Sequence, residues 1–471
     1  MTIFKKIISC LIVFSAISIS GCWTDGGGGS NGNECWTDGG GGSNGNEFWA
    51  ADMDTDEYYK VTAPLYKEGK YCRIHVENES LSLISDSTID YIIDEFDNRI
   101  YPKITSKFGE ESDVDGNGKI ILLILDIRDG FNGTGGYVAG YFDSANTLSK
   151  SLFNPYSNEC DMIYLDCYPA DPMTIDFQMT VAHEFQHLIN FTQKGLSDGI
   201  YQDTWINEGL SSAAEYIYSG SHLSDRISYY NDYQDAYSWG DNFYKWDNEL
   251  IDYSTVYLFF QWMRIHSDDG DAIYKDILDS SYTDYNAVVE QIKAHSSLYS
   301  SISISESSWT QIMVDWLIAN QINKTSGKLG YNGEITGLTK MASTNDSVGY
   351  TAAYPYEGMI QSLTGNYTRQ SGSGSNITYL AFDSNGNIDT TSPWGDSGLS
   401  GTKYLLAINT NTDTYGSSEK VYLPTSIKSD VLKSYSEIEP QIYKIDILPG
   451  QTSLPVKDKQ AERRKILESL K

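Results

Sequence analysis

The sequence has little positive charge and few long apolar runs. Lysine and arginine total 33 against 64 aspartates and glutamates, so the formal net charge is −31. A surface of this sign repels nucleic acid and anionic membranes, which argues against a nucleic-acid-binding protein. After the N-terminal segment, no apolar run reaches the roughly 20 residues that a membrane-spanning helix needs. The acidity also suits surroundings rich in divalent cations, although solubility alone explains it equally well.

Cysteine is scarce too, with six in 471 residues. Cys10 lies in the N-terminal apolar segment. Cys160 and Cys167 flank the strand-like stretch "DMIYLD", so a local disulfide is one arrangement that an oxidising compartment allows. Spacing alone does not fix the pairing.

The N-terminus has the layout of an export signal, which we place at 1–21. "MTIFKK" supplies two lysines, and "IISCLIVFSAISIS" is an apolar segment too short for a comfortable membrane span. The segment runs into Ser20-Gly21-Cys22, and small residues before a cysteine resemble the bacterial lipobox. The resemblance implies an exported bacterial protein with lipid on Cys22, anchored to the cell envelope at the outer membrane or cell surface. An ordinary signal peptide with a coincidental cysteine is the alternative.

Composition divides the rest of the chain. "CWTDGGGGSNGNE" occurs twice in tandem, and its Gly, Ser and Asn content predicts a flexible tether at 22–47. Residues 48–330 mix strand and helix patterns and are long enough to enclose a sizeable core. Gly, Ser, Thr and Asn then rise, and short alternating runs predict a β-rich accessory region at 335–450. A charged tail at 451–471 follows.

Periodicity within 48–330 predicts an α+β fold. Strand patterns occur in "YCRIHVE", "KIILLILDI", "GTGGYVAGYFD" and "NECDMIYLDCYP". Helix patterns occur in "DSTIDYIIDEFDNRIYPKITSKFG", whose Asp-Ser-Thr start suits a cap, and at 174–193, 204–218 and most of 252–324. We expect a mixed or antiparallel sheet beside the helix at 174–193, a mainly helical lower half, and a cleft between them.

The stretch "VAHEFQHLIN" at 181–190 lies in the helix at 174–193. His183 and His187 are four residues apart, so both imidazoles project from one face and can reach one cation, such as zinc. Glu184 points elsewhere, where it can approach a metal-bound water. With only six histidines in the chain, a chance match is an event of about one in a few hundred. Two ordinary core or surface histidines are the alternative.

A catalytic zinc needs three protein ligands and an open position. Glu208, near the start of "TWINEGLSSAAEYIY", follows His187 after a gap that suits a helix end, a loop and a returning helix. Glu215 lies seven residues further on, two turns along the same face, where it can accept a hydrogen bond from a ligating histidine. The alternative for either glutamate is a solvated surface position.

These motifs resemble the glutamate zincins. Several stretches resemble the hyicolysin family of secreted bacterial metallopeptidases more specifically, namely "DVDGNGKIILLILDI", "GGYVAGYF", "NECDMIYLDCYP", "VAHEFQHLINF", "TWINEGLSSAAEYIY" and "DYSTVYLFFQW". The likeness covers about 110–265, extending to 55–330. It implies a zincin-like domain that cleaves proteins or peptides internally. It also implies zinc ligation by His183, His187 and Glu208, with Glu184 as the catalytic base.

Two other functions fit part of the pattern. "WINEG" and the later glutamate also match aminopeptidase-N-like enzymes, but the G-x-M-E-N motif that binds a free amine in those enzymes is missing. Its absence favours internal cleavage. A surface binding or adhesion protein on an inactive zincin scaffold is the second alternative, and the intact ligand pattern weighs against it.

Peptide hydrolysis of this type also calls for a donor to the oxyanion. Tyr253, Tyr257 and His222 are the candidates, and we predict Tyr253. With 36 tyrosines in the chain, an ordinary packing role is the alternative for either tyrosine.

The segment "DVDGNG" offers a second cation site. Asp113, Asp115 and Asn117 fall at alternate positions, and Gly118 permits the turn, which resembles the first half of an EF-hand calcium loop. The twelfth position is Ile124 instead of glutamate, so a complete EF-hand is excluded. A partial Ca²⁺ loop that borrows ligands elsewhere and a solvated acidic turn are the two interpretations.

Overall fold

The computed structural model describes residues 46–426, except 134, 153, 198, 234–241, 247, 340–342, 345–349, 364–366, 369–370, 396–398, 414–415 and 424. The predicted signal peptide, Cys22, nearly all of the tether, and the tail therefore lie outside the described residues. None of the described helices is long and apolar enough to cross a membrane.

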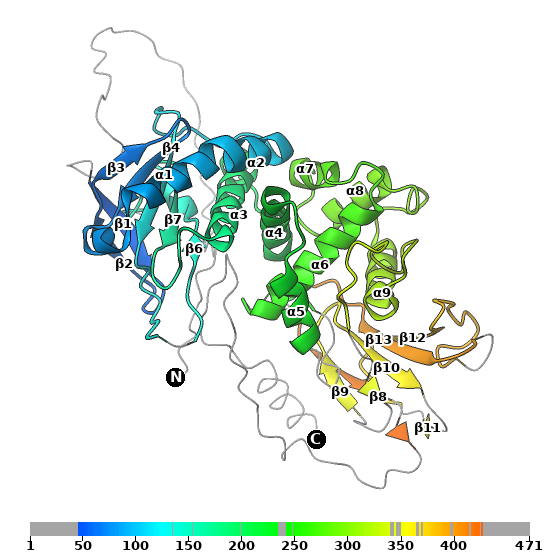
Figure 1. Cartoon of the computed structure of the whole chain (residues 1–471). Coiled ribbons are helices and arrows are strands. Elements are labelled where there is room, and N and C mark those ends of the chain that lie inside the picture. The colour runs from blue at the N-terminus through cyan, green and yellow to red at the C-terminus, as the bar shows by residue number, and fades with distance from the viewer. Residues whose placement is uncertain are drawn as a thin grey trace.

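A five-stranded mixed sheet forms the N-terminal half (Figure 1). Its strands, in spatial order, are β3 (Leu65–Glu68), β4 (Cys72–Val76), β5 (Ile120–Leu125), β7 (Met162–Asp166) and β6 (Gly140–Tyr141). The three central strands run parallel, and β3 and β6 are antiparallel to their neighbours. All six residues of β5 are buried, as expected of a continuous apolar strand covered on both faces.

The two faces of this sheet pack against different elements. Ile121 and Leu123 of β5 face a hairpin of β1 (Glu47–Asp52) and β2 (Glu57–Thr62). Leu122 and Ile124, which alternate with them, face the helices. The hairpin begins at Glu47, which is the last residue of the expected tether.

A helical rod covers the second face of the sheet. It consists of α1 (Asp86–Glu95), a π-helical turn (Phe96–Ile100) and α2 (Tyr101–Phe108). The predicted Asp-Ser-Thr cap is wrong by one residue, because Ser85 is the N-cap and its side chain accepts a hydrogen bond from Thr88 N. Gly109, with φ of +99°, ends the rod in a conformation that glycine adopts readily.

Around β7, one expected strand is much shorter than predicted, and the disulfide that the sequence allowed is not formed. The stretch "GTGGYVAGYFD" forms only the two-residue strand β6, because its glycines favour turns over a ladder. No disulfide joins Cys160 to Cys167; both thiols are free and buried. They flank β7, about 20 Å apart for seven extended residues, and pack into the two opposite cores.

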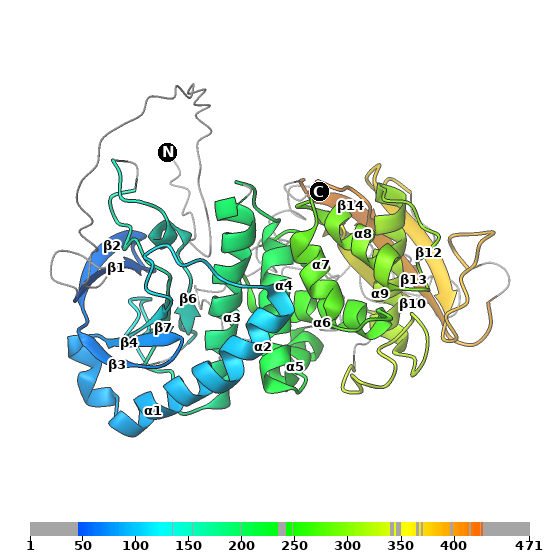
Figure 2. The same ribbon diagram turned by 90° about the horizontal axis from the view of Figure 1, so that it is seen from above.

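The middle of the molecule is helical (Figure 2). Its helices are α3 (Ile175–Phe191), α4 (Thr204–Ser219), α5 (Ser224–Tyr233), α6 (Leu250–His266), α7 (Ala272–Asp279), α8 (Tyr285–His295) and α9 (Glu306–Ile322). A π-helical turn, Thr192–Leu196, extends α3. The helices predicted at 174–193, 204–218 and most of 252–324 are confirmed. Helix α4 packs between α3 and α6, so the expected sheet and helical halves meet at α3 and α4.

The described C-terminal residues are β-rich, as predicted for this part of 335–450. A four-stranded sheet has the order β12 (Ile377–Asp383), β13 (Lys403–Asn409), β10 (Gly358–Leu363) and β8 (Ser343–Thr344). Two strand pairs accompany it, β9 (Tyr350–Ala353) with β14 (Glu419–Tyr422), and β11 (Tyr367–Thr368) with β15 (Thr425–Ser426). Ile360, Leu406 and Ile408 join the same apolar core as Leu317 of α9.

Candidate metal centre

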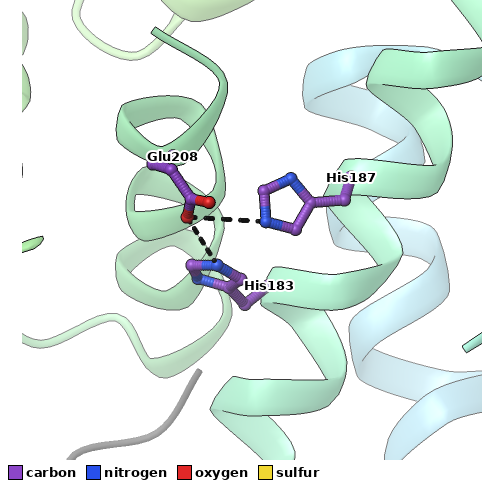
Figure 3. A group of neighbouring side chains, drawn as sticks. All are labelled: His183, His187 and Glu208. Atoms are coloured by element: carbon purple, nitrogen blue, oxygen red, sulfur yellow. Dashed lines mark ion pairs between the residues drawn. The ribbon is translucent and has the colours of Figure 1, made fainter. Parts of the chain in front are cut away.

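Helices α3 and α4 bring together His183, His187 and Glu208. Both imidazoles point toward the glutamate (Figure 3). Glu208 Oε2 lies 3.3 Å from His183 Nε2 and 3.6 Å from His187 Nε2. All three side chains are buried, and their ligand atoms lie within 4.8 Å of one another. The structure therefore groups the three residues in the way their spacing predicts.

The geometry and chemistry of this group fit a zinc ion. A tetrahedral zinc with bonds of about 2.0–2.1 Å places its ligand atoms about 3.4 Å apart, close to the two separations observed. Glu208 Oε2 is buried and accepts no well-aligned hydrogen bond. A buried carboxylate oxygen in that condition is costly unless a cation satisfies it. Two nitrogens and one carboxylate also match the donor set of catalytic zinc sites.

The second ring nitrogen of His183, Nδ1, is hydrogen-bonded to a carboxylate. Glu215 Oε1 lies 2.7 Å from His183 Nδ1, so Nδ1 donates its proton to this carboxylate, and Nε2 is the nitrogen that faces Glu208 on the metal side. Glu215 is fully buried, and Arg226 Nη2 lies 3.3 Å from the same oxygen. Glu215 thus lies where its helical spacing predicted. Arg226 was missed, because nothing in its own sequence surroundings connects α5 to this centre.

The second ring nitrogen of His187 has two neighbours on α4. Asn207 Oδ1 and Ser211 Oγ each lie 3.1 Å from His187 Nδ1. The Ser211 hydroxyl donates to Gln186 Oε1, which leaves the amide oxygen of Asn207 as the acceptor for the ring proton. Both residues were missed by the sequence reasoning. The sequence did contain a signal for them, because Asn207 directly precedes Glu208 and Ser211 follows Glu208 by about one helical turn.

The charges of the histidines and the carboxylates shift one another's pKa values. Burial alone would lower the pKa of His183, but the carboxylates of Glu208 and Glu215 outweigh it and raise that pKa to about 10. Burial would raise the pKa of Glu208, but His187 and His183 hold it at about 2. A bound cation would compete with the histidine proton, because only neutral imidazole ligates a metal.

Glu184 is buried on α3 next to the two histidines. Burial raises its pKa, and the neighbouring imidazoles oppose that effect. Its side chain passes close to β6, since a Cβ at Gly140 would come within 3.3 Å of Glu184 Cγ. The same Cβ would lie 2.8 Å from Thr180 Cγ2 and 2.9 Å from Tyr164 O. Glycine at this position therefore lets α3 approach the sheet closely enough to seat Glu184.

The three candidates for the oxyanion donor have different surroundings. Burial raises the pKa of Tyr253 well above its usual value, and the charges of Glu208 and Glu184 add to the effect, so this tyrosine lies within the field of the centre. The Tyr257 hydroxyl accepts a hydrogen bond from Leu223 N and contacts His222 Nδ1, both at 3.0 Å. Tyr257 and His222 are thus engaged with each other, and Tyr253 stays the predicted donor.

A second group of carboxylates lies on the acidic loop before β5. Oxygens of Asp113, Asp115 and Asp161 lie within 4.8 Å of one another. Asp161, from the segment before β7, was missed because it is distant in sequence. Asn117 lies beside this group: its side-chain nitrogen donates to Asp115 Oδ2 at 2.5 Å, and its Oδ1 accepts a hydrogen bond from Lys119 N at 2.7 Å. Hydrogen bonds of this kind hold the loop in place. One of them is donated by Val114 N to Asp161 Oδ2 at 2.7 Å.

A mixed sheet beside two helices that enclose a buried His-His-Glu group is similar to the catalytic centres of metal-dependent hydrolases. A curated relative supports this class. The chain is 33% identical over 296 residues to the neutral metalloprotease ShpI of Staphylococcus hyicus. The match covers 60% of this chain and 64% of the relative, so the chain spans less than two thirds of that protein. No family model matches the chain.

Proposed function

We propose that the protein is a zinc-dependent endopeptidase with a zincin-like catalytic domain, related to the hyicolysin-like metallopeptidases. The observation that carries the proposal is the convergence of His183 Nε2, His187 Nε2 and the otherwise unsatisfied Glu208 Oε2 on one point. The likeness to a neutral metalloprotease supports protein or peptide substrates for this centre.

The residues around the centre divide the reaction between them. When bound by His183, His187 and Glu208, zinc would supply Lewis acidity and lower the pKa of a water toward about 7. Glu184 accepts a proton from the attacking water as the oxygen bonds to the peptide carbonyl carbon. Glu184 then delivers that proton to the amine nitrogen as the C–N bond breaks. Its raised pKa favours this second step, in which the protonated carboxyl is the acid.

Cleavage of internal bonds can be separated from the alternatives with the purified protein. Casein and aminoacyl reporters are incubated with it, with and without chelator, and bound metal is measured. We expect fragments of casein, no release from the reporters, loss of activity with chelator and one zinc per chain. Activity on free amino termini alone would identify an aminopeptidase. An absence of stoichiometric zinc, together with an unaltered Glu184→Gln variant, would overturn the proposal and leave a binding protein.

We also propose that the protein is exported and anchored by lipid on Cys22, at the outer membrane or cell surface. The support is the lipobox resemblance of the sequence before this cysteine. In bacterial cells, wild-type protein should incorporate labelled fatty acid and sediment with membranes. Cys22→Ala should do neither, and labelling of that variant would contradict the proposal.

The acidic loop before β5 is proposed as a Ca²⁺ site, with Asp161 as the ligand borrowed from elsewhere. The support is the half EF-hand pattern of Asp113 and Asp115 and the grouping of three carboxylates. Ca²⁺ should raise the melting temperature of the wild-type protein and leave that of Asp161→Asn unchanged. Equal shifts in both proteins would contradict the proposal.

A further inference from the structure

A cavity of about 290 Å³ opens beside the metal centre, between the first turn of α3, the end of α4 and residues 221–226. This volume is at the small end of ligand-binding cavities, so it suits one side chain. Met179 and Leu223 supply apolar wall, and Asp176, Asp225 and Glu215 supply carboxylates.

Two helices, α3 and α4, contribute residues both to the cavity and to the metal centre. Glu215 both lines the cavity and contacts His183 Nδ1 at 2.7 Å. Asp176 and Met179 precede His183 by seven and four residues, so all three lie on one face of α3. Asp176 is thus about 10 Å from His183 along the helix axis. Because an extended peptide advances about 3.3 Å per residue, a residue within two positions of the cleaved bond can extend a long side chain into the cavity.

The lining of the cavity is negatively charged. Three carboxylates, from Asp176, Asp225 and Glu215, face one guanidinium, from Arg226, so the formal sum is −3 + 1 = −2. Arg226 Nη2 lies 3.3 Å from Glu215 Oε1 at the buried floor, whereas Asp176 and Asp225 are exposed at the rim. Neither rim carboxylate forms an ion pair with a cation among the described residues.

The two rim carboxylates lie near enough to affect each other. Partial loss of solvent at the rim raises the pKa of Asp176, and the charges of Asp225 and Glu215 add to that rise. Such mutual repulsion is relieved when a cation enters the space between the carboxylates. His222 also lines the cavity, and burial and the charge of Arg264 lower its pKa, which disfavours a positive charge on the imidazole.

We propose that this cavity selects a lysine or arginine side chain of the substrate, from a residue within two positions of the cleaved bond. The methylene groups of that side chain pack against Met179 and Leu223, and its cationic end lies at Asp176 and Asp225. An acidic side chain is repelled, and an aliphatic one leaves the two carboxylates unneutralised. The proposal deepens the peptidase function and rests on it.

The test uses peptides that differ at a single position near the cleaved bond, where Lys, Arg, Gln, Leu or Glu is placed in turn. At one of the scanned positions, kcat/KM should be about tenfold higher for Lys and Arg than for Gln. Asp176→Asn or Asp225→Asn should each reduce this preference to about threefold, and the double variant should abolish it. Asp90→Asn, an exposed carboxylate on α1, is the matched control and should keep the full preference.

Preference for Leu, or an unchanged Lys preference in the double variant, would overturn the inference while leaving the peptidase function standing. If neither casein nor any peptide is cleaved, the proposed function fails, and the cavity is tested by binding alone. Ligand-observed NMR should then detect n-butylguanidinium on the wild-type protein and on Asp90→Asn, but not on the double variant. Absence of binding to the wild-type protein, or equal binding to all three, would overturn the inference.

Discussion

Gly140 of β6 lies directly against Glu184 of α3, so that a single added methyl group would approach Glu184 Cγ to 3.3 Å. The sheet edge thereby sets the position of the residue proposed to move the proton. A glycine at a strand edge and a glutamate in a helix are 44 residues apart (184 − 140). Their contact links the packing of the fold to the chemistry of the site.

Gly140→Ala should lower both stability and activity. The new Cβ would overlap Thr180 Cγ2 and Tyr164 O, so α3 must shift or the sheet must bend. We expect a loss of about 1–3 kcal/mol in the free energy of unfolding. Gly337→Ala is the control, because its Cβ would meet only Ile227 Cγ2 at an ordinary 3.6 Å. Chemical denaturation measures both variants, and equal losses would contradict this explanation.

Glu184→Gln should remove activity but keep the metal. The amide cannot accept the water proton, so kcat should fall by about 100- to 10,000-fold. Zinc content should remain at one ion per chain, since the proposed ligands are untouched. Kinetics on casein and metal analysis of the same sample provide the two measurements. A variant that loses zinc along with activity would assign Glu184 to ligation.

The neighbours of the two histidines should tune zinc affinity. Asn207→Ala removes the amide acceptor at His187 Nδ1, and the affinity should fall by about 10- to 100-fold, measured by competition with a fluorescent chelator. Glu215→Gln should weaken zinc similarly. It should also cost about 1.5–3 kcal/mol of stability, because the charge facing Arg226 is lost from a fully buried site. Unaltered zinc affinity in both variants would refute a role in orienting the rings.

Asp166 at the end of β7 should make stability depend on pH. Burial raises its pKa to about 8, against about 3.9 in an unfolded chain. The folded state therefore binds the proton more tightly. Its contribution to stability is complete below about pH 4 and is lost as pH rises toward 8, by on the order of 1 kcal/mol per pH unit.

Asp166→Asn should flatten this dependence. Wild-type and variant proteins are unfolded with denaturant at several pH values between 4 and 9, and the difference between their free energies of unfolding is compared. As pH rises, the free energy of unfolding of the variant should increase relative to that of the wild-type protein. A constant difference across the range would show that Asp166 has an ordinary pKa in the folded protein.

Local periodicity predicted the parts of this structure that depend on neighbouring residues. The four-residue spacing of His183 and His187 fixed their common helix face, and the apolar run of β5 fixed a strand buried on both sides. Glu208 could be predicted as a ligand because one short loop joins the two helices. These features need only the geometry of a helix or a strand.

The remaining features depend on contacts between distant segments. Arg226 reaches Glu215 from another helix, and Asp161 joins the acidic loop from the segment before β7, the strand next to β5 in the sheet. The separation of Cys160 from Cys167 follows from their positions on either side of β7 and in different apolar cores. No pattern within a short window of sequence carries this information.

The C-terminal sheet shares its interior with the helical centre through Ile360, Leu406 and Ile408, which pack in the same core as Leu317. The C-terminal sheet and the helices around the candidate metal centre therefore share one apolar core. Clipping the chain before β10 would expose apolar surface on α9, and we expect it to destabilise the helices packed against α9. The stability of the helices that carry the candidate metal centre should thus depend on strands that lie far beyond them in the chain.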